Sequence, residues 1–102
     1  MTHAYIIVDM QISDMEQYKQ YMAEAPAAVK AAGGEYLVRG GQFEVMEGNW
    51  QPARMAMLRF PSFEQAKAFY ASEMYKAARA KRAGATQFFN MILVEGVAAP
   101  IL

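Results

Sequence analysis

Four side chains that could hold and transform a small anion lie in and beside the longest irregular stretch of the sequence: Arg39, Glu47, Trp50 and Arg54. Two guanidinium groups can hold a carboxylate or an enolate through paired hydrogen bonds. A glutamate can remove a proton when burial raises its pKa, and an indole offers a flat apolar wall to an aromatic ligand. The pattern predicts a catalytic site in which Arg39, Glu47 and Arg54 act on a substrate that Trp50 contacts. The structural alternative is that Arg39 and Glu47 form a cross-strand ion pair and Trp50 closes the edge of a dimer.

Five tyrosines and one asparagine form a second group of candidate ligand-binding residues: Tyr5, Tyr18, Tyr21, Tyr70, Tyr75 and Asn90. Hydroxyl and amide groups at the end of an apolar pocket can orient a small polarised ligand. Asn90 and Asp9 are also polar exceptions in apolar segments, where a buried polar group must find a partner. The alternative is that the tyrosine rings flank the core with their hydroxyls in water, and that Asp9 faces solvent or a dimer rim.

The composition argues against several other kinds of chemistry. The 102 residues include no cysteine and a single histidine, His3, so neither a thiol nucleophile nor a metal site is expected. Ten lysines and arginines balance ten acidic residues, which argues against a nucleic acid or an anionic membrane as partner. The sequence lacks the glycine motifs that bind nucleotide phosphates, so no cofactor is expected. With no signal or membrane-spanning segment, the protein is expected in the cytoplasm.

Alternation of apolar residues predicts four strands, over residues 4–12, 35–39, 54–60 and 86–95. The second strand is expected to resume over 42–46, after a bulge or turn at Gly40 and Gly41. The last strand is apolar on both faces, because two sets of residues alternate along it: Phe88, Ile92 and Val94, and Phe89, Met91 and Leu93. The tail from Gly96 to Leu102 is only loosely specified.

Two capping-box patterns predict helix starts, one from Ser13 to Glu16 and one from Ser62 to Gln65. The first helix is expected to end at Gly33 and Gly34, and Pro26 to kink or divide it near Glu24. Ser72 is expected to cap a further helical segment that runs through Arg82 and stops at Gly84. Basic side chains near the end of that segment are expected to complement the helix dipole: Lys76, Arg79, Lys81 and Arg82.

The order of these elements is strand, helix, strand, strand, helix, strand. It indicates one domain over residues 1–102 with an α+β, ferredoxin-like β-α-β-β-α-β fold, in which the helices cover one face of an antiparallel sheet. Two helices cannot cover a sheet that is apolar on both faces, and an exposed apolar face favours aggregation. We therefore expect a homodimer paired sheet to sheet. The alternative is that some of these apolar residues lie on barrel rims or under the tail.

Two long strings of residues resemble the family called domain of unknown function 1330: Gly33-Gly34-Glu35-Tyr36-Leu37-Val38-Arg39-Gly40-Gly41 and Glu47-Gly48-Asn49-Trp50-Gln51-Pro52-Ala53-Arg54. The resemblance extends from Tyr5 to Gly96. It implies a dimeric α+β barrel, in which a ferredoxin-like protomer pairs through its sheet, but it implies no common reaction. The chain departs from the family pattern at Met15, where a proline is frequent, and at Phe69, where a tryptophan is frequent. The second change alters the size of the pocket if Phe69 lines it.

Two functions fit these observations. The first is a small homodimeric enzyme, similar to the cofactor-independent oxygenases and isomerases of the dimeric α+β barrels, that acts on a small organic acid or an aromatic compound. Arg39 and Arg54 would hold the anion, Glu47 or a tyrosine would move a proton, and Trp50 would shape the site. The alternative is a non-catalytic dimer that binds a small molecule or is associated with stress. Haem degradation is disfavoured because His3 is the only histidine.

Overall fold

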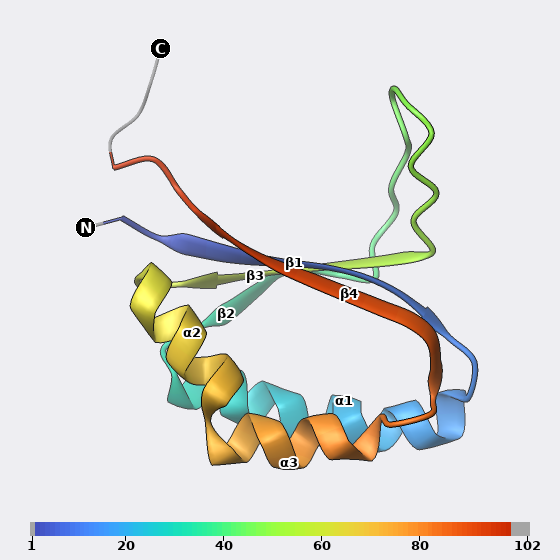
Figure 1. The fold of residues 1–102 in the computed structure, drawn as a ribbon, viewed down its shortest axis with the longest axis horizontal. Coiled ribbons are helices and arrows are strands. Elements are labelled where there is room, and N and C mark those ends of the chain that lie inside the picture. The colour runs from blue at the N-terminus through green and yellow to red at the C-terminus, as the bar shows by residue number, and fades with distance from the viewer. Residues whose placement is uncertain (1, 99–102) are drawn as a thin grey trace.

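Four antiparallel strands and three helices make up the computed structural model, which describes residues 2–98. Along the chain they are β1 (Ala4–Ile12), α1 (Met15–Ala31), β2 (Glu35–Arg39), β3 (Arg54–Phe60), α2 (Phe63–Ala71), α3 (Glu73–Lys81) and β4 (Thr86–Glu95). The strands form one sheet in the order β2-β3-β1-β4, and the helices lie on one of its faces (Figure 1). The predicted ferredoxin-like arrangement is confirmed, with α2 and α3 together in the place of the second helix.

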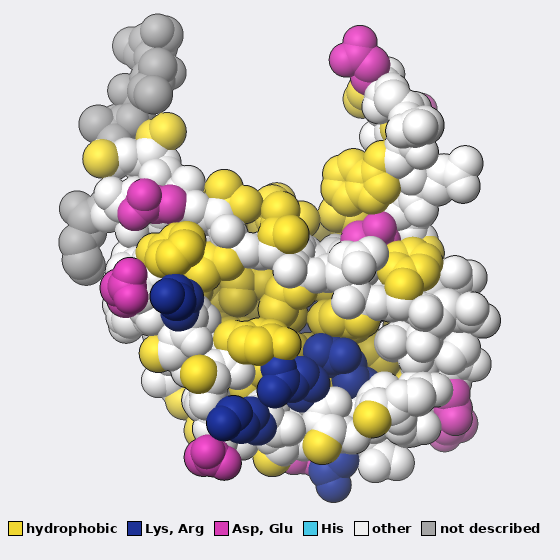
Figure 2. All heavy atoms as spheres, viewed as in Figure 1, with side chains coloured by type: hydrophobic (Ala, Val, Ile, Leu, Met, Phe, Trp, Pro, Cys, Tyr) yellow, Lys and Arg dark blue, Asp and Glu magenta, His cyan; other side chains and the backbone are white. Residues whose placement is uncertain are grey.

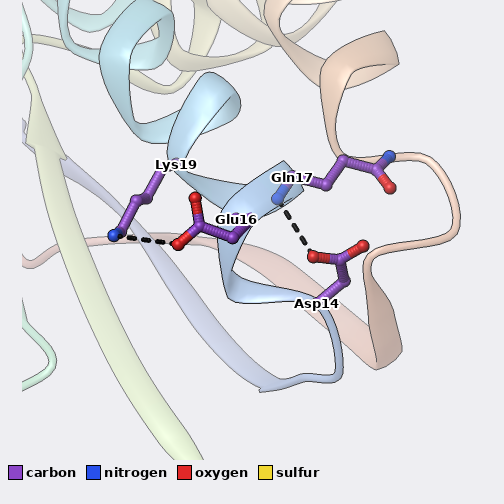
Figure 3. A network of polar contacts seen from close by, with 4 residues as sticks. All are labelled: Asp14, Glu16, Gln17 and Lys19. Carbon is purple, nitrogen blue, oxygen red and sulfur yellow. Dashed lines mark hydrogen bonds and ion pairs between the residues drawn. The ribbon is translucent and has the colours of Figure 1, made fainter.

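The start of α1 differs from the prediction by one residue. Asp14, not Ser13, is the N-cap, and its carboxylate accepts a hydrogen bond of 3.1 Å from the backbone N–H of Gln17 (Figure 3). Glu16 does not complete a capping box with Ser13, because its carboxylate pairs with Lys19 Nζ at 3.4 Å. Aspartate and serine cap helices about equally well, so two adjacent capping residues leave the exact start open.

The other two helix starts agree with the prediction. Ser62 caps α2 and accepts from the backbone N–H of Gln65, and Ser72 caps α3 and accepts from the backbone N–H of Tyr75, both at 3.1 Å. Helix α3 gives way to a turn in which Gly84 has a φ of +82°, a conformation that favours glycine.

Pro26 lies inside α1 without dividing it. The helix continues to Ala31, so the predicted division near Glu24 is wrong. A proline lacks the N–H that would donate to the carbonyl four residues earlier, which here belongs to Met22. Nη2 of Arg39 donates to that carbonyl oxygen at 3.3 Å. A side chain from β2 therefore satisfies the carbonyl that Pro26 leaves free.

Residues 40–53, called the arm below, do not continue the sheet. The predicted resumption of the second strand over 42–46 is wrong, because the arm leaves the sheet and projects away from the helices (Figure 1). The chain turns at Gly40, which has a φ of +72° and donates its N–H to the carbonyl of Met55 at 2.8 Å. Pairing between β2 and β3 ends there, so nothing holds the next residues in the sheet.

The two faces of the sheet differ in what covers them. Apolar residues of β1 and β3 pack against the helices, and their buried side chains form the core with Ala25, Val29, Phe69 and Tyr75. On the other side, called the open face below, Ile92 is 58% and Val94 is 42% exposed. The expected apolar excess is thus present, and the described part of one protomer leaves it uncovered. Residues 99–102 of the tail lie outside the described residues. Within the described part, none of the helices is long and apolar enough to span a membrane.

Candidate functional site

The register of the sheet arranges the residues that face the helices in rows. Arg54 of β3, Met10 of β1 and Phe89 of β4 lie in one row across three neighbouring strands. The adjacent row begins with Arg39 of β2 and ends with Met91 of β4. Both rows therefore carry an arginine toward the β2 edge of the sheet and an apolar residue at the β4 edge. These rows border the space between the sheet and the helices, where two cavities lie.

The larger cavity, called the outer groove below, opens beside β4 and is bounded by α2 and α3. It has a volume of about 730 Å³. Its apolar walls include Ile6, Phe89, Met91 and Leu93, and its polar side chains are Lys67, Tyr70, Arg79 and Arg82. Figure 2 shows a hollow of hydrophobic side chains bordered by basic ones. None of the described residues that line the outer groove is acidic.

Two arginines of α3 lie against aromatic rings of the outer groove. The guanidinium carbon of Arg79 is 4.4 Å from the ring centre of Tyr70, and that of Arg82 is 3.5 Å from the ring centre of Phe89. Contact with an aromatic ring leaves the N–H groups of a guanidinium free to donate to a ligand. Neither arginine pairs with a carboxylate of the described residues. Nε of Arg82 is buried and has no hydrogen-bond partner.

The smaller cavity, called the inner cavity below, lies between the sheet and α1 and has a volume of about 40 Å³. It shares Phe89 and Met91 with the outer groove, so the two cavities are neighbours. Its polar lining consists of four tyrosines and two arginines: Tyr18, Tyr21, Tyr36, Tyr75, Arg39 and Arg54. Phe69, the departure from the family pattern, also lines it and packs against Tyr75 with 4.4 Å between ring centres.

Three tyrosines of the inner cavity, Tyr18, Tyr21 and Tyr36, have raised pKa values. Burial and the adjacent Tyr75 raise the pKa of Tyr21, whose hydroxyl hydrogen-bonds that of Tyr75 at 2.8 Å. Burial also raises the pKa of Tyr18 and of Tyr36, although nearby arginines act in the opposite direction. A phenol with a raised pKa donates a hydrogen bond at neutral pH but is a poor source of the phenolate base.

Gly40 leaves room for the guanidinium of Arg54. A Cβ atom at residue 40 would lie 2.5 Å from Cζ of Arg54, closer than two carbons can approach without displacement. The positive φ of Gly40 independently favours glycine at this position. The turn that ends β2 therefore leaves space that the guanidinium of Arg54 occupies.

The sheet separates the first predicted cluster into two parts. Arg39 and Arg54 meet at the inner cavity, whereas Glu47 and Trp50 lie on the exposed arm. The alternative ion pair between Arg39 and Glu47 does not form, because the arm carries Glu47 away from β2. Trp50 is 57% exposed and its Nε1 donates to Asp9 on the open face at 3.2 Å.

Asp9 anchors the arm to the sheet. Its side chain is buried, with 7% exposed, and accepts from Trp50 Nε1 and from the backbone N–H of Ala53 at 3.1 Å. A buried carboxylate needs such donors, so the sequence correctly marked Asp9 as a polar residue that requires partners. The solvent-facing alternative for Asp9 is wrong, because the arm covers it.

The structure divides the predicted tyrosine group as well. Tyr18, Tyr21 and Tyr75 line the inner cavity, and Tyr70 lines the outer groove. Tyr5 and Asn90 do not join them, because both belong to the open face. Tyr5 alternates with the buried Ala4 and Ile6, and the exposed Asn90 pairs with Asp9 in the register.

Arg79 and Arg82 were not predicted to belong to a site. Their basic character was assigned to the helix dipole alone. A usable signal is their spacing from Tyr75, since positions four and seven residues later lie on the same face of a helix. The described residues include no group of three or more side chains that could hold a metal ion.

The chain matches the family described as "Domain of unknown function (DUF1330)" over residues 3–97. The protein belongs to the DUF1330 family. No curated protein matches it significantly.

Solved structures share the fold of this DUF1330 protein at low sequence identity. A protein of unknown function from Rhodopseudomonas palustris is 13% identical with a TM-score of 0.76, over 96% of this chain and 85% of that one. A proposed antibiotic biosynthesis monooxygenase from Caulobacter crescentus is 14% identical with a TM-score of 0.67, over 94% and 91%. A dimeric ferredoxin-like protein of unknown function from Thermobifida fusca is 16% identical with a TM-score of 0.60, over 94% and 92%.

Proposed function

We propose that this DUF1330 protein is a homodimer that binds a small organic acid with an aromatic or aliphatic body in the outer groove. The observation that carries the proposal is an apolar groove of about 730 Å³ bordered by two guanidinium groups without carboxylate partners in the described part of the chain. Small-molecule sites usually combine such apolar walls with a few polar groups that set orientation. The volume lies in the range of sites for drug-sized ligands.

The charges select an acid rather than a neutral compound. Arg79, Arg82 and Lys67 border the outer groove and no described acidic residue does, so the local potential is positive. A carboxylate can accept two parallel hydrogen bonds from one guanidinium, and such charge-assisted bonds are about twice as strong as neutral ones.

The homodimer in this proposal is supported by the open face. Its exposed apolar residues, which include Ile92 and Val94, would be covered by a second copy related by a two-fold axis. The arm adds further exposed apolar side chains beside this face: Phe43, Val45, Met46 and Trp50. The structurally similar Thermobifida fusca protein is described as dimeric. Light scattering during size-exclusion chromatography tests the assembly, and a mass near the 11.4 kDa of one chain would refute it.

Paired ligands test the binding proposal. We expect benzoate and octanoate to bind, and their uncharged amides to bind at least about tenfold more weakly, because the amides lose the charge-assisted bonds. Arg82→Gln is expected to weaken the binding of both acids. Arg59→Gln is the matched control, since Arg59 pairs with Glu35 on the edge strand and lines neither cavity. Equal calorimetric affinities for acids and amides would refute the proposal.

A second candidate function is a cofactor-independent enzyme, of an oxygenase or isomerase type, that acts on the same class of ligand. The likeness to a proposed antibiotic biosynthesis monooxygenase favours it. In this proposal Arg39 and Arg54 stabilise an anionic form of the substrate, and the neutral tyrosines donate hydrogen bonds to it. Glu47 cannot serve as the proton acceptor at this cavity, because the arm holds it on the other side of the sheet from Arg39 and Arg54.

Turnover of the wild-type protein separates this enzyme from a binding protein. Such an enzyme shows turnover, measured as oxygen uptake or substrate isomerisation, that Arg54→Gln lowers and that Glu47→Gln on the arm leaves unchanged. Absence of any turnover in the wild-type protein, with ligand affinity intact, would leave the binding function alone.

A further inference from the structure

We propose that the inner cavity is a second anion subsite, so that the preferred ligand carries an acidic group at each end. This inference rests on the proposed function, in which the outer groove holds the first acidic group. The second group would contact Arg54, and Arg39 beside it, at the β2 side of the space between the layers. The apolar body of the ligand would lie along Phe89 and Met91, which line both cavities.

The first argument is the distribution of arginines. The chain has five, and in the described part only Arg59 pairs with a carboxylate, that of Glu35. The other four line one of the two cavities. Arg54, Arg79 and Arg82 are partly buried, and buried charges are normally paired, so three such arginines without carboxylates indicate that the opposite charge comes from a ligand.

The second argument is the distance between the two arginine pairs. Arg54 and Phe89 are separated in their row only by Met10, so their Cα atoms are two interstrand spacings apart, about 10 Å. Arg82 lies on the ring of Phe89 at 3.5 Å from its centre. Arg54 and the pair formed by Phe89 and Arg82 therefore lie at opposite ends of this row, with Met10 between them.

The third argument concerns the inner cavity itself. Its volume of about 40 Å³ is little more than the share of one water in the liquid, about 30 Å³, so it admits a head group but no ring. Hydroxyl groups of neutral tyrosines can donate to an anion there. Arg39 already donates to the Met22 carbonyl, whereas Arg54 makes no side-chain hydrogen bond within residues 2–98. Of the two arginines that line the inner cavity, Arg54 is thus the one whose guanidinium has no hydrogen-bond partner within residues 2–98.

Ligands matched in length but not in charge test this inference. We expect suberate to bind at least about tenfold more tightly than octanoate, and terephthalate more tightly than benzoate, because the second carboxylate gains charge-assisted bonds to Arg54. Arg54→Gln should abolish this preference and leave the affinity for octanoate unchanged. Arg82→Gln should weaken suberate and octanoate together, and Arg59→Gln should change neither.

A measurement on the wild-type protein keeps the test independent of how Arg54→Gln folds. The side-chain Nε–H resonances of the arginines are recorded by NMR during each titration. Suberate should shift the signals of both Arg54 and Arg82, and octanoate that of Arg82 alone. Equal affinities for suberate and octanoate, or an unmoved Arg54 signal with bound suberate, would overturn the second subsite and leave the proposed function standing. If none of the four acids binds, the proposed function fails too.

Discussion

Pro26 and Arg39 are expected to be energetically coupled across the space between α1 and β2. Pro26 cannot donate to the Met22 carbonyl, and Nη2 of Arg39 donates to it at 3.3 Å. We predict that Arg39→Gln destabilises the wild-type protein more than it destabilises a Pro26→Ala variant. In the variant, the N–H of residue 26 donates to the Met22 carbonyl, so the guanidinium is no longer needed there.

The coupling can be estimated from this one hydrogen bond. A typical intramolecular hydrogen bond contributes about 1 kcal/mol, and the charge of Arg39 raises this value while its exposure lowers it. We therefore expect Arg39→Gln to lower the free energy of unfolding by about 1 kcal/mol more when residue 26 is proline than when it is alanine. The contact of Arg39 with the ring of Tyr36, at 4.6 Å, is present in both backgrounds and cancels.

Urea unfolding followed by circular dichroism measures the free energy of unfolding of the four proteins in this cycle. All four are compared at one protein concentration, because the stability of a dimer depends on concentration. A second cycle with Arg59→Gln in place of Arg39→Gln is the control, and its effects should add. A coupling energy below about 0.3 kcal/mol between Pro26 and Arg39 would refute the reasoning, since that is the usual error of additivity.

Three further predictions concern the arm and the tyrosine pair. Asp9→Ala should release Trp50, the only tryptophan, and shift its fluorescence emission to longer wavelength, whereas the helix-cap variant Asp14→Ala should leave the emission unchanged. Tyr21→Phe should lower the free energy of unfolding by about 1 kcal/mol in urea titrations, because it leaves the buried hydroxyl of Tyr75 without its partner; an unchanged value would contradict this. The free energy of unfolding should fall as the pH rises above about 10, because the folded state raises the pKa of Tyr21 and keeps a proton that the unfolded state releases. In the same titration, the free energy of unfolding of the Tyr21→Phe variant should fall less steeply with pH.

Local patterns predicted most of the fold. The bounds of β1, β3 and β4 and the start of β2 follow from apolar alternation, because the sheet buries one face against the helices and repeats with a period of two. The errors arose where a distant residue decides the outcome. Pro26 does not divide α1, and the Met22 carbonyl that it leaves free accepts a hydrogen bond from Arg39 on another element.

The candidate site was predicted less well, because it depends on which side of the sheet each residue faces. Trp50 and Arg54 are close in sequence, yet the arm places Trp50 against Asp9 on the open face while Arg54 reaches the inner cavity. The path of a loop without strand pairing has no periodic signal in the sequence. Arg79 and Arg82 carried a periodic signal, but their relation to β4 emerges only when α3 packs beside the sheet.

The net charge of zero is a poor guide to what this protein attracts. Its ion pairs use acidic side chains at the surface, such as Glu16 with Lys19 and Glu24 with Lys81. The arginines of the two cavities are left without carboxylates within residues 2–98, so the space between the layers is positive although the chain is neutral. At physiological ionic strength charges are screened beyond about 8 Å, so a ligand in the outer groove experiences the local arginines rather than the whole molecule. A neutral balance therefore argues against a long polyanion such as nucleic acid, which needs an extended basic surface, but is fully compatible with a small acid.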